Sequence, residues 1–368
     1  MPAVAVAVAH GATASGDGAP VTASGAARAQ HHAHLSKARV RARPKVVSRA
    51  VTFAVRNTNT SALPCAADGA AYEVKGHLVG PRSAVSGTSA RRRAVTLYLH
   101  GLGFGEFFWN FKQVPGYDYA TAQARAGHVS VVIDRLGYDS SGHPDGNQTC
   151  LGSQADTAHQ VVQLLRSGKY GVEGGNAVRF KKVALAGHSV GGLIADIEAY
   201  SFKDVDALII MSISYSNLPF AAIEFGQARA VCQAGGQPSE PGGPPGYAYM
   251  GQTPAAFRAT FFHSARNSVI GAVTAARNRD PCGDTASVIP ALQRERSVAS
   301  IKVPVLVICG TRDVLFSPVG CDLQRDRYTG ARSASLALVK NAGHAVTLER
   351  EEATFRKKVS RWLARRGF

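Results

Sequence analysis

The chain has 368 residues, of which 45% are hydrophobic and 18% charged, a composition typical of a globular protein with enough apolar residues for a core. No uninterrupted apolar run reaches the ~18 residues that a membrane-spanning helix requires, so the sequence predicts no integral membrane segment. Lys and Arg number 42 against 25 Asp and Glu, which gives a formal net charge of +17.

Residues 1–48 are rich in Ala, Gly, Ser, Thr, Arg and His without sustained periodicity, which predicts a disordered or cleaved segment. The alternating Ala and Val of residues 3–9 look like the end of the apolar region of a signal peptide, although no basic stretch precedes them. The cluster of His31, His32 and His34 could bind metal, but a flexible tail without a second group of ligands predicts no metal site.

The positive charge gathers in three places. Residues 28–49 hold seven Lys and Arg and no acid, Arg91–Arg93 form a second run, and Arg356–Arg366 contains a third. No helix-turn-helix, zinc-finger or RNA-binding signature accompanies them, so nucleic acid is not expected as a partner. The basic N-terminal segment predicts at most weak binding to anionic surfaces.

From residue 49 onward, eight segments have the pattern of strands. The first two alternate polar and apolar residues, as exposed antiparallel strands do, and the other six are buried-type apolar runs followed by a turn and a helical pattern. The eight segments are Val51–Val55, Ala71–Val79, Ala94–Leu99, Val129–Asp134, Lys182–Ala186, Ala207–Ile213, Val303–Cys309 and Ser335–Val339. The helical patterns are Tyr119–Ala126, Gln154–Ser167, Gly191–Ser201, Cys321–Tyr328 and Glu349–Arg366. This order predicts an α/β fold with a mostly parallel eight-stranded sheet and helices on both faces.

Residues 215–300 interrupt the alternation, because they contain no buried strand. A loop of that length without structure of its own would be unusual, so a small helical insertion is expected, with one helical pattern at Thr253–Asn267. The chain is therefore divided into an α/β core of residues 49–214 and 301–368 and an inserted cap or lid of residues 215–300.

Six cysteines, an even number, occur without any C-x-x-C pair, which argues against zinc and thioredoxin chemistry. Their places in the sequence suggest three pairs: Cys232 with Cys282, Cys309 with Cys321, and Cys65 with Cys150. Disulfides indicate an oxidising compartment, so the sequence predicts a secreted protein. The alternative is a cytoplasmic protein with six buried thiols.

Gly187-His-Ser-Val-Gly191 follows one of the buried apolar runs and precedes a helical pattern, which is the context that a G-x-S-x-G nucleophile requires. The glycines permit a tight turn that exposes Ser189, and the helix N-terminus favours the negative charge that develops in the reaction. Ser189 is therefore predicted to be a catalytic nucleophile.

A serine needs a base, and the base needs an acid that orients it. Asp313 ends Gly310-Thr-Arg-Asp313 after the strand Val303–Cys309, and His344 follows the last strand. Both lie on loops after strands, where open α/β sheets build their sites. We expect Asp313 to hold the imidazole of His344, which accepts the proton of Ser189.

An oxyanion hole is predicted from the N–H groups of Leu102 and Val190. Leu102 belongs to His100-Gly-Leu-Gly103, which follows the strand Ala94–Leu99, and Val190 follows the nucleophile. His100 is expected to form structural hydrogen bonds rather than to take part in catalysis. Aromatic residues are frequent nearby and in the insertion, and the candidate substrate-binding residues are His100, Phe104, Tyr215 and Phe220.

These motifs, together with Asp134-Arg-Leu-Gly-Tyr138, resemble the α/β-hydrolase superfamily over roughly residues 50–368. The resemblance implies a cap between strands six and seven, and esterase-like or lipase-like activity without metal or cofactor. A small-molecule or lipid-like carboxylic ester is thus the expected substrate, cleaved through an acyl-enzyme. Lactone, amide or peptide hydrolysis remain open, as do perhydrolysis, C–C bond hydrolysis and ligand binding without turnover.

Overall fold

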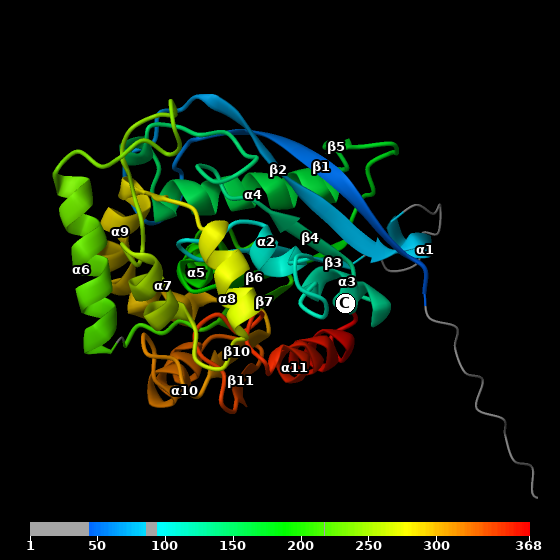
Figure 1. The fold of residues 1–368 in the computed structure, drawn as a ribbon. Coiled ribbons are helices and arrows are strands. Elements are labelled where there is room, and N and C mark those ends of the chain that lie inside the picture. The colour runs from blue at the N-terminus through cyan, green and yellow to red at the C-terminus, as the bar shows by residue number, and fades with distance from the viewer. Residues whose placement is uncertain (1–43, 86–93, 217) are drawn as a thin grey trace, which may run out of the picture. The chain divides into compact units, whose positions relative to one another are not determined.

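A nine-stranded sheet runs through the part of the chain that the computed structural model describes, namely residues 44–85, 94–216 and 218–368. The strand order is β11-β10-β7-β6-β3-β4-β2-β1-β5 (Figure 1). Six neighbouring strands are parallel: β3 (Ala94–Leu99), β4 (Ser130–Ile133), β6 (Lys182–His188), β7 (Ala207–Met211), β10 (Val305–Gly310) and β11 (Ala334–Val339). The long hairpin of β1 (Val46–Arg56) and β2 (Ala71–Pro81) adds antiparallel strands beside β4.

The predicted α/β architecture is confirmed. The large sheet of the described chain has nine strands, one more than the eight expected. The additional strand is β5 (Gly171–Val172), which pairs with Val51 and Thr52 at the edge of the sheet. Two residues followed by Glu173-Gly-Gly175 have no alternation and no apolar run. β5 therefore exists because β1 offers it a free edge, which no local pattern reveals.

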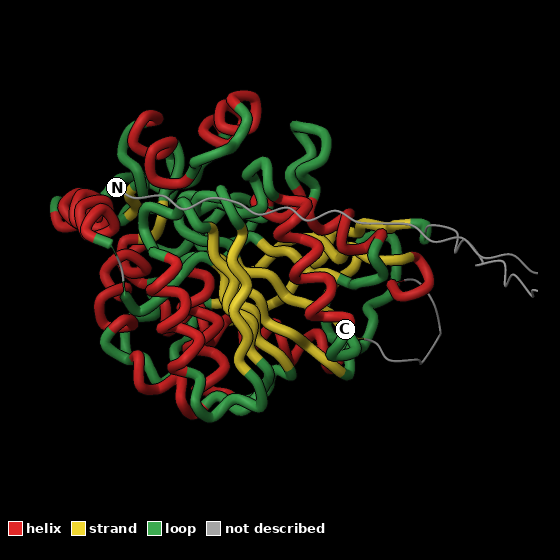
Figure 2. Tube along the Cα trace, turned by 90° about the horizontal axis from the view of Figure 1, so that it is seen from below, coloured by secondary structure: helices red, strands yellow, loops and turns green. Residues whose placement is uncertain are grey.

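Helices cover both sides of the sheet (Figure 2). On one side α3 (Tyr119–Arg125) packs against α11 (Glu352–Ala364), while α4 (Leu151–Ser167) packs against α5 (Val190–Phe202). α10 (Pro318–Arg327) lies on β10 and β11, and short turns α1 (Arg82–Val85), α2 (Phe107–Asn110) and η1 (Gly146–Gln148) complete the core. Local signals set these ends: Ser317 caps α10 before Pro318, and Gly168, at φ 71°, ends α4 in the left-handed region.

The segment between β7 and β10 is mainly helical. It contains α6 (Pro219–Gln233), α7 (Pro254–Phe261), α8 (Asn267–Ala275), α9 (Cys282–Leu292) and η2 (Glu295–Ser300), with a two-stranded sheet of β8 (Tyr247–Ala248) and β9 (Asp280–Pro281). The helical pattern expected at Thr253–Asn267 is helical only from Pro254 to Phe261, and the next helix, α8, begins at Asn267. α9 joins this segment to the core through α4 and α5.

Three disulfides form the predicted pairs, and no described cysteine is free. Cys232–Cys282 joins α6 to α9, Cys309–Cys321 joins β10 to α10, and Cys65–Cys150 joins the loop after β1 to the start of α4. The longest of these loops spans 85 residues. Cross-links over such separations stabilise the fold mainly by restricting the unfolded chain.

Several predictions concern residues outside the described part of the chain. The signal-like residues 3–9, the cluster from His31 to His34, Arg91–Arg93 and most of the basic segment 28–49 lie there. Strand β1 begins at Val46, inside the segment that was expected to end at residue 48. Among the helices that the structure describes, none is both long enough and apolar enough to cross a bilayer.

Candidate active site

Ser189 occupies the turn between β6 and α5 in a strained backbone conformation, with φ 53° and ψ −126°. A non-glycine residue in this region costs about 1–3 kcal/mol and persists only where the surroundings enforce it. Here its N–H donates to the carbonyl oxygen of Met211 on β7 at 2.8 Å. The side chain is thereby held at the carboxyl end of the central parallel strands, at the start of a helix.

The flanking glycines are required by close backbone contacts. A Cβ atom at position 187 would lie 2.0 Å from the carbonyl oxygen of Gly191, and one at position 191 would lie 2.5 Å from that of Leu99. Both distances are far inside van der Waals contact, so no side chain fits at either position. The G-x-S-x-G spacing thus follows from the packing of the turn on β3.

His344 and Asp313 form a buried pair. His344 Nδ1 lies 2.8 Å from Asp313 Oδ2, and both side chains are inaccessible to solvent. The other carboxylate oxygen of Asp313 accepts the N–H groups of Leu315 and Phe316 at 2.8 and 3.2 Å. These backbone donors fix the carboxylate, which in turn fixes the imidazole with its Nδ1 proton directed at Asp313.

The loop of His344 lies against the residue that precedes Ser189. His188 Nε2 donates to the carbonyl oxygen of His344 at 2.9 Å, and the centroids of the two rings are 4.8 Å apart. Burial lowers the pKa of His188 well below its ordinary value, so this ring is neutral. His344 Nε2 is buried and has no hydrogen-bond partner within the described chain, which leaves its lone pair available to accept a proton.

The loop after β3 packs on the same turn. A Cβ atom at Gly101 would lie 2.8 Å from Ser189 Cβ, so the two backbones are in direct contact. Leu102 follows in this loop, and Val190 begins α5. In the described part of the chain, no loop or capping hydrogen bond occupies the N–H of Leu102 or of Val190. Both groups therefore remain available to an acceptor.

The four candidate substrate-binding residues have different surroundings. His100 Nδ1–H donates to the carbonyl oxygen of Gly101 at 2.8 Å, and its Nε2 accepts the N–H of Arg135 at 3.0 Å, so both ring nitrogens are used structurally. Phe104 is buried in an aromatic cluster and lies 5.8 Å, between ring centroids, from His188. Tyr215 donates to Asp196 at 3.3 Å, and Phe220 packs on the hydrophobic core.

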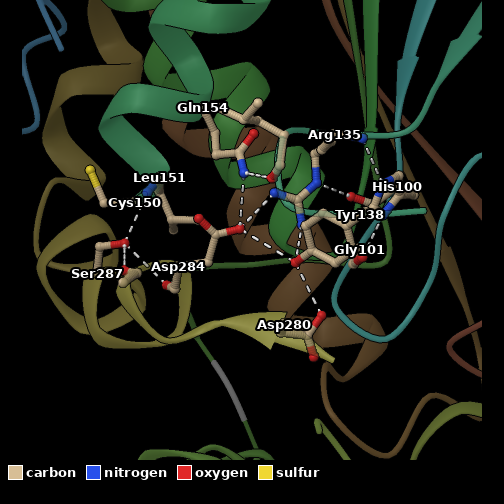
Figure 3. Close-up of polar contacts among 12 residues, drawn as sticks. His100, Gly101, Arg135, Tyr138, Cys150, Leu151, Gln154, Asp280, Asp284 and Ser287 are labelled. Carbon is tan, nitrogen blue, oxygen red and sulfur yellow. Dashed lines mark hydrogen bonds and ion pairs between the residues drawn. The ribbon is translucent and has the colours of Figure 1, made fainter. Parts of the chain in front are cut away.

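A buried polar network beside the site was not anticipated from the sequence (Figure 3). Arg135 donates to Asp284 at 2.7 Å, to the Tyr138 hydroxyl at 2.8 Å and to the carbonyl oxygen of His100 at 3.1 Å. Asp280 accepts the Tyr138 hydroxyl at 3.0 Å. The loops after β3 and β4 are thus bound to α9 and β9 of the segment between β7 and β10.

Asp280 also holds the loop that carries Leu102. Its Oδ1 accepts the N–H of Gly103 at 2.6 Å, and its Oδ2 accepts that of Met250 at 3.1 Å. Gly103 has a φ of 75°, so this loop has an unusual backbone that needs a fixed anchor. In the sequence, Asp280 is one acid in the polar stretch of residues 277–284, and nothing there singles it out.

Burial raises the pKa of Asp280 from 3.8 to about 7. In the unfolded chain this carboxyl ionises near its ordinary pKa, whereas the folded chain keeps its proton up to about pH 7. The unfolded state therefore binds fewer protons in this window, and stability falls as pH rises through it. We expect the free energy of unfolding of the wild type, relative to that of Asp280→Asn, to fall by on the order of a few kcal/mol between pH 4 and 8.

Urea unfolding across this pH range measures the difference. Glu73→Gln is the control, because the Glu73 side chain is 59% exposed and should give a nearly constant difference from wild type. A difference between wild type and Asp280→Asn that does not change with pH would show that Asp280 titrates normally.

An apolar cavity of about 360 Å³ lies between α6, α9 and the site. Two of its lining residues border the candidate catalytic residues: the ring of Phe316 lies 5.8 Å from that of His344, and Ile213 packs against Gly192, three residues after Ser189. The lining residues are Ile213, Ala222, Phe225, Gly226, Arg229, Thr285, Ala286, Val288, Ile289, Leu292 and Phe316. Neither Tyr215 nor Phe220 is among them.

The sequence and the fold were compared with protein families and with known proteins and structures. The family model described as "Alpha/beta hydrolase family" matches residues 97–357. A search of curated proteins finds no match to the sequence. Among solved structures, a thermophilic esterase from Thermogutta terrifontis superimposes with a TM-score of 0.59 at 16% identity, covering 85% of this chain and 98% of that one.

A monoacylglycerol lipase from Paleococcus ferrophilus gives a TM-score of 0.55 at 19% identity, covering 74% of this chain and 94% of the other. An enol-lactonase from Burkholderia xenovorans LB400 gives 0.53 at 18%, covering 80% and 97%. Likeness at these identities establishes the shared fold. Because the family model spans most of the chain, including both flanks of the Ser189 turn, this protein belongs to the alpha/beta hydrolase family.

Proposed function

We propose that this protein is a serine hydrolase that cleaves carboxylic esters by acyl transfer, with Ser189 as nucleophile, His344 as base and Asp313 as its orienting acid. The observation that carries the proposal is the buried His344–Asp313 pair beside the strained turn of Ser189, with His344 Nε2 unpartnered among the described residues. A histidine held this way is a ready proton acceptor.

In the first half of the reaction, Ser189 Oγ attacks the ester carbonyl carbon while its proton moves to His344 Nε2. The carbonyl π electrons move onto oxygen, where the N–H groups of Leu102 and Val190 stabilise the negative charge. The tetrahedral intermediate then collapses, the alcohol leaves with the proton from His344, and an acyl-serine remains. Asp313 stays ionised and balances the transient positive charge of the imidazole.

In the second half, His344 removes a proton from water, and the resulting hydroxide attacks the acyl carbon. Collapse of this intermediate breaks the bond to Ser189 Oγ, which regains its proton from His344. The two halves balance with the ester and water as reactants and the carboxylic acid and alcohol as products. Asp280 acts indirectly in both halves, because it anchors the loop of Leu102 through the N–H of Gly103.

We propose that the apolar cavity binds the acyl chain of the substrate. Apart from Arg229 and Thr285, its lining is mainly aliphatic and aromatic, and it has the size of small-ligand sites. Phe316 and Ile213 connect it to the candidate catalytic residues. The lipase and esterase among the structural neighbours are consistent with a lipid-like ester. Three disulfides further favour an oxidising, extracellular compartment.

Hydrolysis of p-nitrophenyl esters from acetate to palmitate tests the proposal. Each methylene that enters the cavity contributes about 0.8 kcal/mol, or roughly a fourfold increase in kcat/KM, until the cavity is full. We therefore expect kcat/KM to rise from acetate to longer chains and then to level off or fall. Turnover of lactones or peptides but of no ester in the series would contradict ester hydrolysis.

A pair of variants on α6 tests the cavity itself. Ala222 lines the cavity, and Ala222→Phe should lower kcat/KM for the longer esters while leaving acetate turnover unchanged. Ala230 is exposed on the same helix and does not line the cavity, so Ala230→Phe is the matched control. An equal effect of both variants, or an effect of Ala222→Phe on every ester alike, would place the acyl chain elsewhere.

A further inference from the structure

Three side chains that can bind metal converge between α4 and α5, apart from the candidate active site. His159 lies on α4, Glu198 lies on α5, and Asp204 lies in the loop that follows α5 (Figure 1 shows these two helices side by side). One ligand atom from each residue lies within 4.8 Å of the other two. The imidazole Nδ1 of His159 is 2.8 Å from Asp204 Oδ2, which orients the ring toward the cluster.

Glu198 is unusual because its buried carboxylate has no hydrogen-bond donor among the described residues. The side chain is fully buried, and neither of its carboxylate oxygens has a hydrogen-bond donor among the described residues. Asp204 Oδ1 is a third buried oxygen without a donor. Buried carboxylates are normally paired or hydrogen-bonded, because an unpaired buried charge is very costly. Burial, and then the adjacent Asp204, raise the pKa of Glu198 well above its ordinary value.

The positive charge of Arg166 lowers the pKa of Glu198 only in part, and the hydrogen bonds of Arg166 go to other groups. Arg166 donates to the carboxylate of Asp206 at 2.7 Å and to the backbone oxygens of Lys181 and Asp204 at 2.8 and 2.5 Å. Gln163 Nε2 donates to Asp204 Oδ2, the oxygen that His159 already contacts. No other side chain or backbone donor of the described residues therefore lies between the Glu198 carboxylate and Asp204 Oδ1, so within the chain only a proton on Glu198, whose pKa is raised, can join them.

We propose that His159, Glu198 and Asp204 bind a divalent cation of the zinc type. One imidazole nitrogen and two carboxylate oxygens are common zinc ligands, and water can complete a four-coordinate site. With bonds of about 2.0–2.2 Å, ligand atoms on a tetrahedral zinc ion lie roughly 3.3–3.6 Å apart, so rotamer adjustments of about an ångström are sufficient. Calcium fits less well, because it prefers six to eight oxygen ligands.

A cation can reach the cluster from solvent, and once bound it would link neighbouring elements of the fold. The side chains of His159 and Asp204 are 28% and 16% exposed, so the cluster is reached from the surface. A bound cation would cross-link α4, α5 and the start of β7. Since α5 begins at Ser189, the cation would stabilise the helix behind the nucleophile without contacting the reacting atoms.

Isothermal titration of the full chain with Zn²⁺, in a background in which His31, His32 and His34 are alanine, tests the proposal. We expect one equivalent to bind, and the thermal midpoint to rise by at least about 3 °C at 100-fold Kd. Ca²⁺ should bind much more weakly. Removing even an outer partner of a metal ligand costs about 10- to 100-fold in affinity, so Glu198→Gln and Asp204→Asn should each cost ~100-fold or more.

Two further variants make the outcome decisive. Asp322→Asn changes an exposed acid on α10 and should leave zinc affinity unchanged. His159→Asn changes a partly exposed side chain, so it reports on the site even where a substitution of buried Glu198 prevents folding. Absence of stoichiometric zinc binding, or unchanged affinity in Glu198→Gln or His159→Asn, would overturn the proposal and leave a proton shared between Glu198 and Asp204.

Discussion

Replacing Ser189 with alanine is expected to lower kcat/KM for p-nitrophenyl esters by about 10⁴- to 10⁶-fold, because no other group then attacks the carbonyl carbon. The fold should persist. Ala keeps the Cβ atom of Ser and adds no bulk to the strained conformation, and the hydrogen bond to Met211 comes from the backbone. Circular dichroism and the thermal midpoint check the fold, and initial rates check the activity.

Ser212 provides a matched control for this substitution. It is also buried at the carboxyl end of a strand, has a φ of 50°, and its hydroxyl has no hydrogen-bond partner in the described chain. Ser212→Ala should therefore retain most of the wild-type activity. If Ser189→Ala kept more than about a tenth of the activity while Ser212→Ala lost it, the nucleophile would have to be reassigned.

Replacing Asp313 with asparagine should lower kcat by about 10⁴-fold through the wrong tautomer of His344. The N–H groups of Leu315 and Phe316 both donate to Asp313 Oδ1, so the amide oxygen of the variant must take that position. The amide NH₂ then faces His344 Nδ1 and donates to it. His344 must carry its proton on Nε2, where it cannot accept the proton of Ser189.

Asp322→Asn is the control for this substitution. Asp322 follows Asp313 closely in the sequence, but it lies on α10, where it pairs with Arg325. It should retain wild-type kcat. Stopped-flow measurement of the acylation burst separates a loss in the first half of the reaction from a loss in the second. A near-normal kcat for Asp313→Asn with normal folding would mean that His344 is oriented by another group.

Local patterns were sufficient for the α/β core because each of its elements has its own signature. The apolar runs that became β3, β4, β6, β7 and β10 are almost entirely buried, so hydrophobicity alone marks them. β11, at the edge of the sheet, is an apolar run that is only partly buried. Ser189, Asp313 and His344 were predicted for the same reason, because each lies in the turn or loop that follows one of the strands. The disulfide pairs were predicted from position along the chain, and the structure confirms them.

Side-chain contacts between residues that are far apart in the chain could not be predicted from local patterns. Asp280 gains its place only because β9 passes the loop of Gly103, 177 residues earlier in the chain. Glu349 likewise accepts the N–H groups of His263, Ser264 and Gly343, and so joins the His344 loop to the end of α7. In sequence, each is an ordinary acid among others.

By itself, then, the sequence determined the order of the core strands and helices and the residues proposed for acyl transfer, because these follow from burial and turn geometry within short windows. It only suggested the cysteine pairs from their places in the chain, and the structure confirms them. Only the tertiary structure decided the edge strand β5, the anchors Asp280 and Glu349, the apolar cavity beside α6 and α9, and the cluster of His159, Glu198 and Asp204. Each of these depends on the approach of segments that are far apart in the chain. The free energy of such contacts comes from burial and pairing, which no local pattern encodes.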